Sequence, residues 1–204
     1  GVGKTVMACA CRAKRLAPNQ AGGPSPGVVP LSGGVNWRAE TARFALKLGV
    51  LDFSGADRSV DRVGGYDIVL TSYGTLRRDA LLLKDIEFDY AILDEAQTIK
   101  NANTAAAKAA RLIRARHRLA LSGTPIENHL GELWSLFDFL MPGFLGTADA
   151  FHDRFEHPIM IQADMTVRDR LKKRIHPFIL RRLKSEVAKD LPPMIDWKYD
   201  GGNF

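Results

Sequence analysis

Residues 91–97 read AILDEAQ, and this stretch decides the fold. Its three apolar residues predict a buried strand, and two adjacent carboxylates, Asp94 and Glu95, follow at the C-terminal end of that strand. In sheets whose strands alternate with helices, ligands bind beyond the carboxyl ends of the strands. An isolated Asp-Glu pair also fits a solvated turn after a buried strand, so the neighbouring segments have to decide between the two.

Apolar runs alternate with segments of helical periodicity on both sides of this stretch. The pattern predicts strands ending at Val29 and at residues 50–53, 66–71, 88–93 and 117–122. It predicts helices at residues 36–48, 75–83, 104–115 and 130–140, with a mostly helical, partly polar arm at 144–191. Such alternation predicts an α/β fold, in which a mostly parallel sheet is covered by helices on both faces.

The chain begins with GVGKT, the second half of the phosphate-loop pattern GxxxxGK[ST]. Gly1 and Gly3 would let backbone N–H groups approach phosphate oxygens at a helix N-terminus. Lys4 would reach the β- and γ-phosphates, and Thr5 would offer its hydroxyl to Mg²⁺. Taken alone, the motif also fits a plain glycine-rich turn.

The order of these two motifs makes each more specific than it is alone. Lys4 precedes Asp94 on the elements that a phosphate-loop ATPase requires, with Asp94 holding Mg²⁺ and Glu95 activating the attacking water. The sequence therefore predicts ATP and Mg²⁺ as cofactors. A third motif, LSGTP at residues 121–125, ends another strand, where its hydroxyls would contact residues 94–97, cap the next helix, or do both.

Composition sets wide bounds on the class of protein. The 204 residues are 46% hydrophobic and 25% charged, as in ordinary globular domains, which excludes a wholly disordered chain. A net charge of +6 fits contact with nucleic acid and fits an ordinary basic surface equally well. Two cysteines, Cys9 and Cys11, offer no disulfide framework or zinc site, and no apolar run or signal-peptide pattern points to a membrane.

Several segments together resemble the motifs of Swi/Snf-type ATPases of helicase superfamily two. They are GVGKT (1–5), PLSGGVNWRAE (30–40), LTSYGTL (70–76), LDEAQTIKN (93–101), LSGTPIENHLGELWSLFDFL (121–140) and FILRRLKSEVAKDLPP (178–193). The resemblance implies a first RecA-like lobe at residues 1–143, a helical extension at 144–194 and a tail at 195–204. It also implies ATP-driven movement along double-stranded DNA.

The resemblance implies a role for each matching residue. It assigns catalysis to Lys4, Asp94 and Glu95; nucleotide binding to Gly1, Gly3, Lys4, Thr5 and Gln97; and Mg²⁺ to Thr5 and Asp94. It assigns DNA contacts to Ser32, Asn36, Thr71 and Ser72, and coupling of the nucleotide state to DNA to Ser122 and Thr124. Hydroxyl and amide groups suit contacts to phosphate that do not depend on base sequence. Trp37 is expected mainly to pack under its motif.

The departures from the family pattern are specific. The phosphate loop lacks its opening, and Gly27 stands where the family prefers a bulky apolar residue. We therefore expect the chain to be a fragment. Its expected partners are double-stranded DNA and a second RecA-like lobe of the same parent chain, and no membrane partner is expected. It would act in the cytoplasm on a bacterial nucleoid, or in a nucleus. Two alternatives stay open. The chain could be a truncated, non-catalytic remnant that binds DNA or a partner protein, or the motor lobe of another nucleic-acid ATPase such as a type I restriction subunit.

Overall fold

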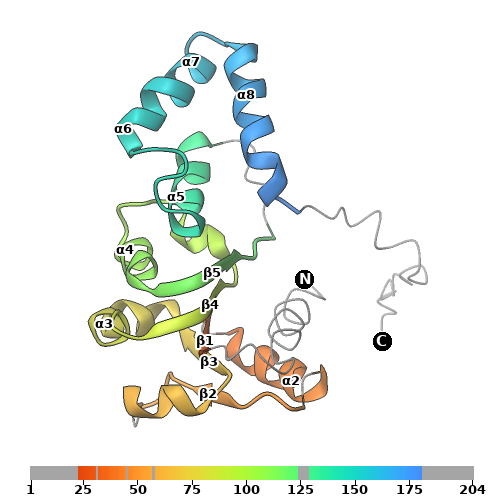
Figure 1. Ribbon diagram of the computed structural model, residues 1–204, viewed down its shortest axis with the longest axis vertical. Helices are drawn as coiled ribbons and strands as arrows, with labels where there is room; N and C mark the ends of the chain where they lie inside the picture. Colours follow the sequence, from red (N-terminus) through yellow and green to blue (C-terminus); the bar gives the residue numbers. More distant parts are fainter. Residues whose placement is uncertain (1–22, 31, 45, 57, 124–128, 181–204) are drawn as a thin grey trace, which may run out of the picture. The chain divides into compact units, whose positions relative to one another are not determined.

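The computed structural model describes residues 23–180 except 31, 45, 57 and 124–128 (Figure 1). The chain divides into two compact units, Gly1–His157 and Pro158–Phe204. The expected phosphate loop at residues 1–5, the helix predicted after it, Thr124 and the end of the helical arm lie outside the described residues. A functional boundary at residue 143 stays a prediction.

The first unit is built on a parallel sheet of five described strands. They are β1 (Ser25–Val29), β2 (Val50–Asp52), β3 (Ile68–Ser72), β4 (Glu87–Leu93) and β5 (Arg114–Ala120). Their order across the sheet is β2-β3-β1-β4-β5, and every pairing is parallel. The predicted α/β class is confirmed. Because the strands are parallel, the carboxyl ends of β1, β3 and β4 lie along one edge.

Helices cover both faces of this sheet (Figure 1). They are α2 (Gly34–Phe44), α3 (Tyr73–Leu83), α4 (Ala105–Leu112) and α5 (Leu130–Leu140), with 3-10 turns η1 (Val60–Gly65) and η2 (Ala96–Ile99). Residues of α3, α4 and α5 pack in one core with Phe88 and Leu93 of β4. Trp37 of α2 packs in a second core with Ile68, Leu70 and Ile92. The sheet is therefore the middle of three layers.

Polar side chains fix where two of these helices begin. The Ser72 hydroxyl accepts a hydrogen bond from the Thr75 backbone N–H at the start of α3. The Thr104 hydroxyl accepts one from the Ala107 N–H at the start of α4. Each bond satisfies a donor that the helix itself leaves unpaired. The start of α3 thus coincides with the carboxyl end of β3.

Several boundaries differ from the sequence prediction. The helix predicted to reach residue 115 ends at Leu112, and β5 begins at Arg114 instead of residue 117. The ladder with β4, which pairs Glu87 with Arg114 and Phe88 with Ala115, overrides the helical propensity of these residues. The helix predicted at residues 36–48 runs from Gly34 to Phe44.

The Pro- and Gly-rich segment before Val28 is also partly strand. Residues Ser25–Gly27 pair with Ile68–Leu70 of β3. A Cβ atom on Gly27 would lie 3.1 Å from Leu70 Cδ2 and 3.7 Å from Trp37 Cζ3. At the position where the family prefers a bulky residue, a side chain would therefore require the Leu70 side chain to move by a few tenths of an ångström.

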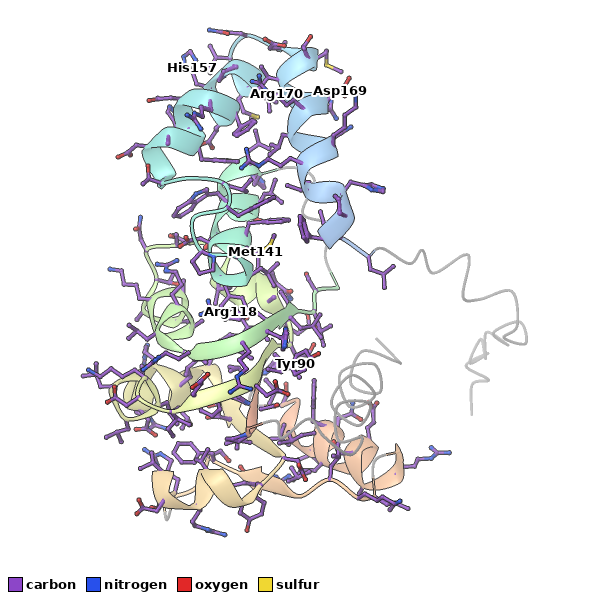
Figure 2. The ribbon with its side chains drawn as sticks, in the orientation of Figure 1. Tyr90, Arg118, Met141, His157, Asp169 and Arg170 are labelled. Carbon is purple, nitrogen blue, oxygen red and sulfur yellow. The ribbon has the colours of Figure 1, made fainter. Side chains whose placement is uncertain are left out.

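Arg118 on β5 ties the strand to α5 (Figure 2). Its Nη1 donates to the Phe139 carbonyl at 2.6 Å and its Nη2 to the Ile113 carbonyl at 2.8 Å. The guanidinium also lies 5.3 Å from the centroid of the Phe139 ring. Burial lowers the pKa of Arg118 from its ordinary value, and the charge of Asp138 opposes that shift. These contacts hold α5 and the end of α4 against β5.

Helical segments follow α5, as predicted. They are α6 (Ala148–Phe151), a π-helical turn (His152–Glu156), α7 (His157–Met160), α8 (Met165–Ile175) and the turn η4 (His176–Phe178). Ala163, at φ 52°, interrupts the helical path before α8, and the Asp164 carboxylate accepts bonds from the Thr166 and Val167 N–H groups. None of the described helices has both the length and the apolar character that crossing a membrane requires.

Candidate active site

Asp94 directly follows the last residue of β4 and is held from several directions. Its backbone N–H continues the ladder with β1 by donating to the Val28 carbonyl at 2.9 Å. Its Oδ2 accepts a hydrogen bond from Trp37 Nε1 at 2.9 Å, and its Oδ1 accepts one from the Glu95 N–H at 2.9 Å. The carboxylate is therefore oriented by the protein at the carboxyl edge of the sheet, as the sequence predicts.

Glu95 adopts a left-handed backbone conformation, with φ 48° and ψ 53°. For a residue other than glycine this conformation costs about 1 kcal/mol. It places the Glu95 side chain where Oε2 accepts a hydrogen bond from Gln97 Nε2 at 2.6 Å. Strained residues of this kind cluster at active sites, and here the strain falls on the residue predicted to activate water.

A hydrogen-bonded chain links Glu95 to the end of β5. Gln97 Oε1 accepts a bond from the Ser122 hydroxyl at 3.0 Å, and the Ala96 N–H donates to the Leu121 carbonyl at 2.8 Å. The predicted contact between the LSGTP motif and residues 94–97 is thus present for Ser122. Its coupling role stays a prediction, and Thr124 lies outside the described residues.

Two aromatic residues at this site were not predicted as part of it. Trp37, which the sequence suggests mainly packs, is 1% exposed and also bonds to the Asp94 carboxylate. The Tyr73 hydroxyl donates to the Asp94 carbonyl at 2.7 Å. A buried Trp or Tyr needs a partner for its N–H or O–H, and this requirement is the signal that identifies them.

The Tyr73 hydroxyl remains a donor over a wide pH range. Burial raises its pKa above the ordinary value, and the charges of Asp94 and Glu95 raise it further. An ionised phenolate beside these two carboxylates would be strongly disfavoured. Tyr73 therefore contributes a neutral hydrogen-bond donor to the site.

The four residues predicted to contact DNA fall into two pairs. Ser32 and Asn36 are exposed, and Asn36 Nδ2 donates to Glu40 Oε1 at 3.3 Å. Thr71 and Ser72 are buried. The Thr71 hydroxyl donates to the Phe53 carbonyl at 3.2 Å, while the Ser72 hydroxyl caps α3. The structure thus gives the second pair internal roles, and DNA contact by all four stays a prediction.

A surface hollow lies next to these residues at the carboxyl edge. Thr71 and Ser72 line it together with the end of β1, the start of α2 and the side chain of Ser54. Arg38 and Asp52 form an ion pair at its rim, with Nη1 and Oδ2 2.8 Å apart. The lining of the hollow is mostly apolar, with Val29, Pro30, Val35 and Leu70 beside the polar residues already named.

The donor set at Asp94 fits Mg²⁺. The two bonds that the carboxylate accepts leave about two of its four lone-pair sites free for a metal ion or its water. Mg²⁺ is bound through one or two carboxylates, several waters and substrate phosphates. Over the described part of the chain, no group of three or more His, Cys, Asp or Glu side chains gathers in a way that could hold a metal ion.

The parallel sheet and the oriented carboxylates at its edge define the RecA-like core of a helicase-like ATPase. The model of the SNF2-related domain matches residues 1–198, and the chain belongs to that family. A solved structure titled "Sulfolobus solfataricus SWI2/SNF2 ATPase core in complex with dsDNA" is 41% identical, with a TM-score of 0.85. The match covers 94% of this chain and 41% of that one.

Curated relatives are much longer than this chain. The TATA-binding protein-associated factor MOT1 of Saccharomyces cerevisiae is 41% identical over 191 residues, which are 86% of this chain and 10% of that protein. An uncharacterized ATP-dependent helicase of Mycoplasma pneumoniae is 39% identical over 199 residues, 96% of this chain and 19% of that protein. The chain therefore corresponds to a small part of proteins of this kind.

Proposed function

We propose that this chain is the ATP-binding and hydrolysing lobe of a motor that translocates along double-stranded DNA and remodels protein–DNA complexes. The observation that carries the proposal is the Asp94–Glu95 pair at the carboxyl end of β4, linked through Gln97 to Ser122. This arrangement holds both carboxylates in fixed positions without enclosing them in a metal cage. Its place of action would be the nucleoid of a bacterium or the nucleus of a eukaryote.

Each residue has a distinct part in the proposed reaction. Asp94 and Thr5 would together hold Mg²⁺. The ion would neutralise charge on the phosphates. Glu95 would orient the attacking water and take its proton. Lys4 would stabilise the charge that develops on the phosphoryl oxygens. Gln97 would report on the occupant of the site, and its bonds to Glu95 on one side and Ser122 on the other support this role.

Double-stranded DNA is the proposed substrate track. The basic net charge of +6 supports a polyanionic partner, and the solved relative is titled as a complex with dsDNA. Exposed Ser32 and Asn36 at the start of α2 supply neutral polar groups suited to phosphate contacts. The salt dependence of binding would measure how many phosphates are neutralised.

Replacing Glu95 by Gln tests the assignment of the catalytic base. In the full-length protein, Glu95→Gln should retain ATP binding and lower hydrolysis by about 100-fold or more, since general-base catalysis contributes on that order. Glu87→Gln is a matched control, because Glu87 begins the same strand and its exposed side chain pairs with Arg116. Hydrolysis by Glu95→Gln at the wild-type rate would refute the role given to Glu95.

Residues 1–204 alone should hydrolyse ATP weakly or not at all, with little stimulation by DNA. We propose that the site is completed by a second RecA-like lobe of the parent protein, which contributes the remaining groups for transition-state stabilisation. Steady-state ATPase assays of the 204-residue chain, with and without duplex DNA, measure this directly. Robust DNA-stimulated turnover by this chain would contradict the need for a second lobe.

A further inference from the structure

Two aromatic side chains from separate elements converge on Asp94. Trp37 Nε1 donates to Asp94 Oδ2 at 2.9 Å, and the Tyr73 hydroxyl donates to the Asp94 carbonyl at 2.7 Å. The first bond joins residues 57 positions apart in the chain, and the second joins residues 21 apart. Trp37 is 1% exposed and Tyr73 is 9% exposed, so both rings are fixed by packing.

Both aromatic residues directly follow residues for which the sequence predicts DNA contacts. Trp37 comes after Asn36 in the first turn of α2, and Tyr73 comes after Ser72 at the first position of α3. A shift of either helix start would therefore move the hydrogen-bond donor that holds Asp94. The two segments reach the same carboxylate residue by independent routes, one through its side chain and one through its backbone.

We propose that Trp37 and Tyr73 are positioning residues that hold Asp94 in its Mg²⁺-binding orientation and transmit the occupancy of residues 32–36 and 71–72 to the metal site. This inference rests on the proposed function. Groups that hydrogen-bond a metal ligand fix its orientation, and their loss costs about 10- to 100-fold in metal affinity or activity. The Trp37 bond takes one lone pair of the Asp94 carboxylate and, together with the Glu95 bond, leaves about two of the four for the metal.

Packing alone does not account for the arrangement. A phenylalanine at position 73 would keep the ring and remove only the O–H donor, whereas a phenylalanine at position 37 would remove the N–H donor together with part of the buried indole. If the rings served the core alone, these replacements would change stability without altering the concentration of Mg²⁺ that the site requires. The metal requirement therefore separates a positioning role from a structural one.

The test measures Mg²⁺-dependent binding of a non-hydrolysable ATP analogue to the full-length protein, with and without duplex DNA. Trp37→Phe should raise the half-saturating Mg²⁺ concentration by about 10-fold. It should also reduce the shift in that concentration that DNA produces in the wild-type protein. Trp134→Phe is the matched control, because the Trp134 indole donates to the Gly146 carbonyl, at 3.0 Å, and not to Asp94. The control should behave as wild type in both measurements.

Tyr73→Phe provides a second, independent variant. Since its bond reaches the Asp94 backbone and not the carboxylate, it should raise the half-saturating Mg²⁺ concentration in the same direction and by less. Tyr66→Phe is its control, because the Tyr66 hydroxyl accepts a bond from Arg62 at the surface. In the double variant of Trp37 and Tyr73 the two effects should not multiply, as expected for groups that act on one residue.

The outcomes separate this inference from the function on which it rests. A wild-type requirement for Mg²⁺ in both aromatic variants, whether or not their thermal stability changes, would overturn the positioning role. If DNA shifts the half-saturating Mg²⁺ concentration equally in wild type and Trp37→Phe, the proposed transmission from residues 32–36 and 71–72 to the metal site is overturned. A wild-type protein that binds the analogue with no dependence on Mg²⁺ would overturn the proposed function, and this inference with it.

Discussion

The carboxyl end of β4 and the stretch around α8 hold their polar groups in contrasting ways. Around Asp94, partners come from α2, α3 and β1, so the geometry depends on the whole first unit. At the start of α8, the Asp164 carboxylate bonds to Thr166 and Val167, two and three residues ahead. The hydrogen bonds of the first region therefore depend on the tertiary fold, whereas those of the second depend only on neighbouring residues at the start of one helix.

The two regions also differ in what they expose. The site lies beside a core in which Trp37 and Leu93 are 1% and 0% exposed. Around α8, Met160, Ile161 and Met165 are 60%, 73% and 59% exposed, and only Leu171 and Ile175 of that helix are buried. Substitutions at the site should therefore lower the stability of the whole first unit. Substitutions around α8 should affect only the structure near that helix.

The largest effect should come from Trp37→Ala. Removing a fully buried Trp side chain should lower the free energy of unfolding by about 3–5 kcal/mol, through lost burial and the cavity left behind. Urea unfolding of the 204-residue chain, followed by far-ultraviolet circular dichroism, measures the change. Trp134→Ala is the control for a partly exposed Trp and should cost less. If Trp37→Ala lowers the free energy of unfolding by less than Trp134→Ala does, the site is not the more strongly packed of the regions compared.

Tyr73→Phe should have an intermediate effect that depends on pH. At neutral pH, losing its bond to the Asp94 carbonyl should cost about 1 kcal/mol. Because the folded-state pKa of Tyr73 is raised by burial, the unfolded state releases the proton first. The stabilisation is thus complete below about pH 10, the unfolded value, and decreases as pH rises above it.

The measurement for Tyr73 is the free energy of unfolding of wild type and variant between neutral and alkaline pH. The difference between the two proteins should shrink as pH rises past the unfolded pKa, since only wild type loses this contribution. Tyr66→Phe, with its surface hydroxyl, should show no such convergence. A difference that stays constant with pH would mean that Tyr73 is not shielded from ionisation by burial.

Asp164→Ala should have an effect of comparable size that is more local. Loss of an N-cap costs about 1 kcal/mol, and here the cost should appear as fraying of α8 instead of unfolding of the first unit. Amide hydrogen exchange should accelerate in residues 165–168 and remain unchanged in β4. Asp169→Ala is the control, because Asp169 is exposed within the same helix (Figure 2). Faster exchange in β4 would show that the two regions are coupled.

The same contrast explains how much the sequence could predict. The strand followed by Asp94 and Glu95 was predictable, because an apolar run and two adjacent carboxylates are local signals. The bond between Trp37 and Asp94 was not, because it depends on how α2 lies on the sheet. Gly27 is similar: the space taken by Leu70 and Trp37 becomes apparent only when the strands are paired.

Boundaries were missed where pairing overrides local preference. Ala- and Arg-rich residues after Leu112 favour helix, yet Arg114 and Ala115 complete the ladder with β4. The left-handed backbone of Glu95 was equally hidden, since no residue type in DEAQ demands it. Roles assigned to Lys4, Thr5 and Thr124 remain predictions, because those residues lie outside the described part of the chain.

The smallest effect should come from replacing Lys172 and Lys173 together by Gln. Both side chains are exposed near the end of α8, where positive charge interacts favourably with the helix dipole by a few tenths of a kcal/mol. The free energy of unfolding should therefore change by less than about 0.5 kcal/mol. Affinity for duplex DNA should also stay close to wild type if this run is a solvated helix face. A large, salt-dependent loss of DNA affinity would instead assign the run to the DNA track, and would make α8 a functional counterpart of the site at β4.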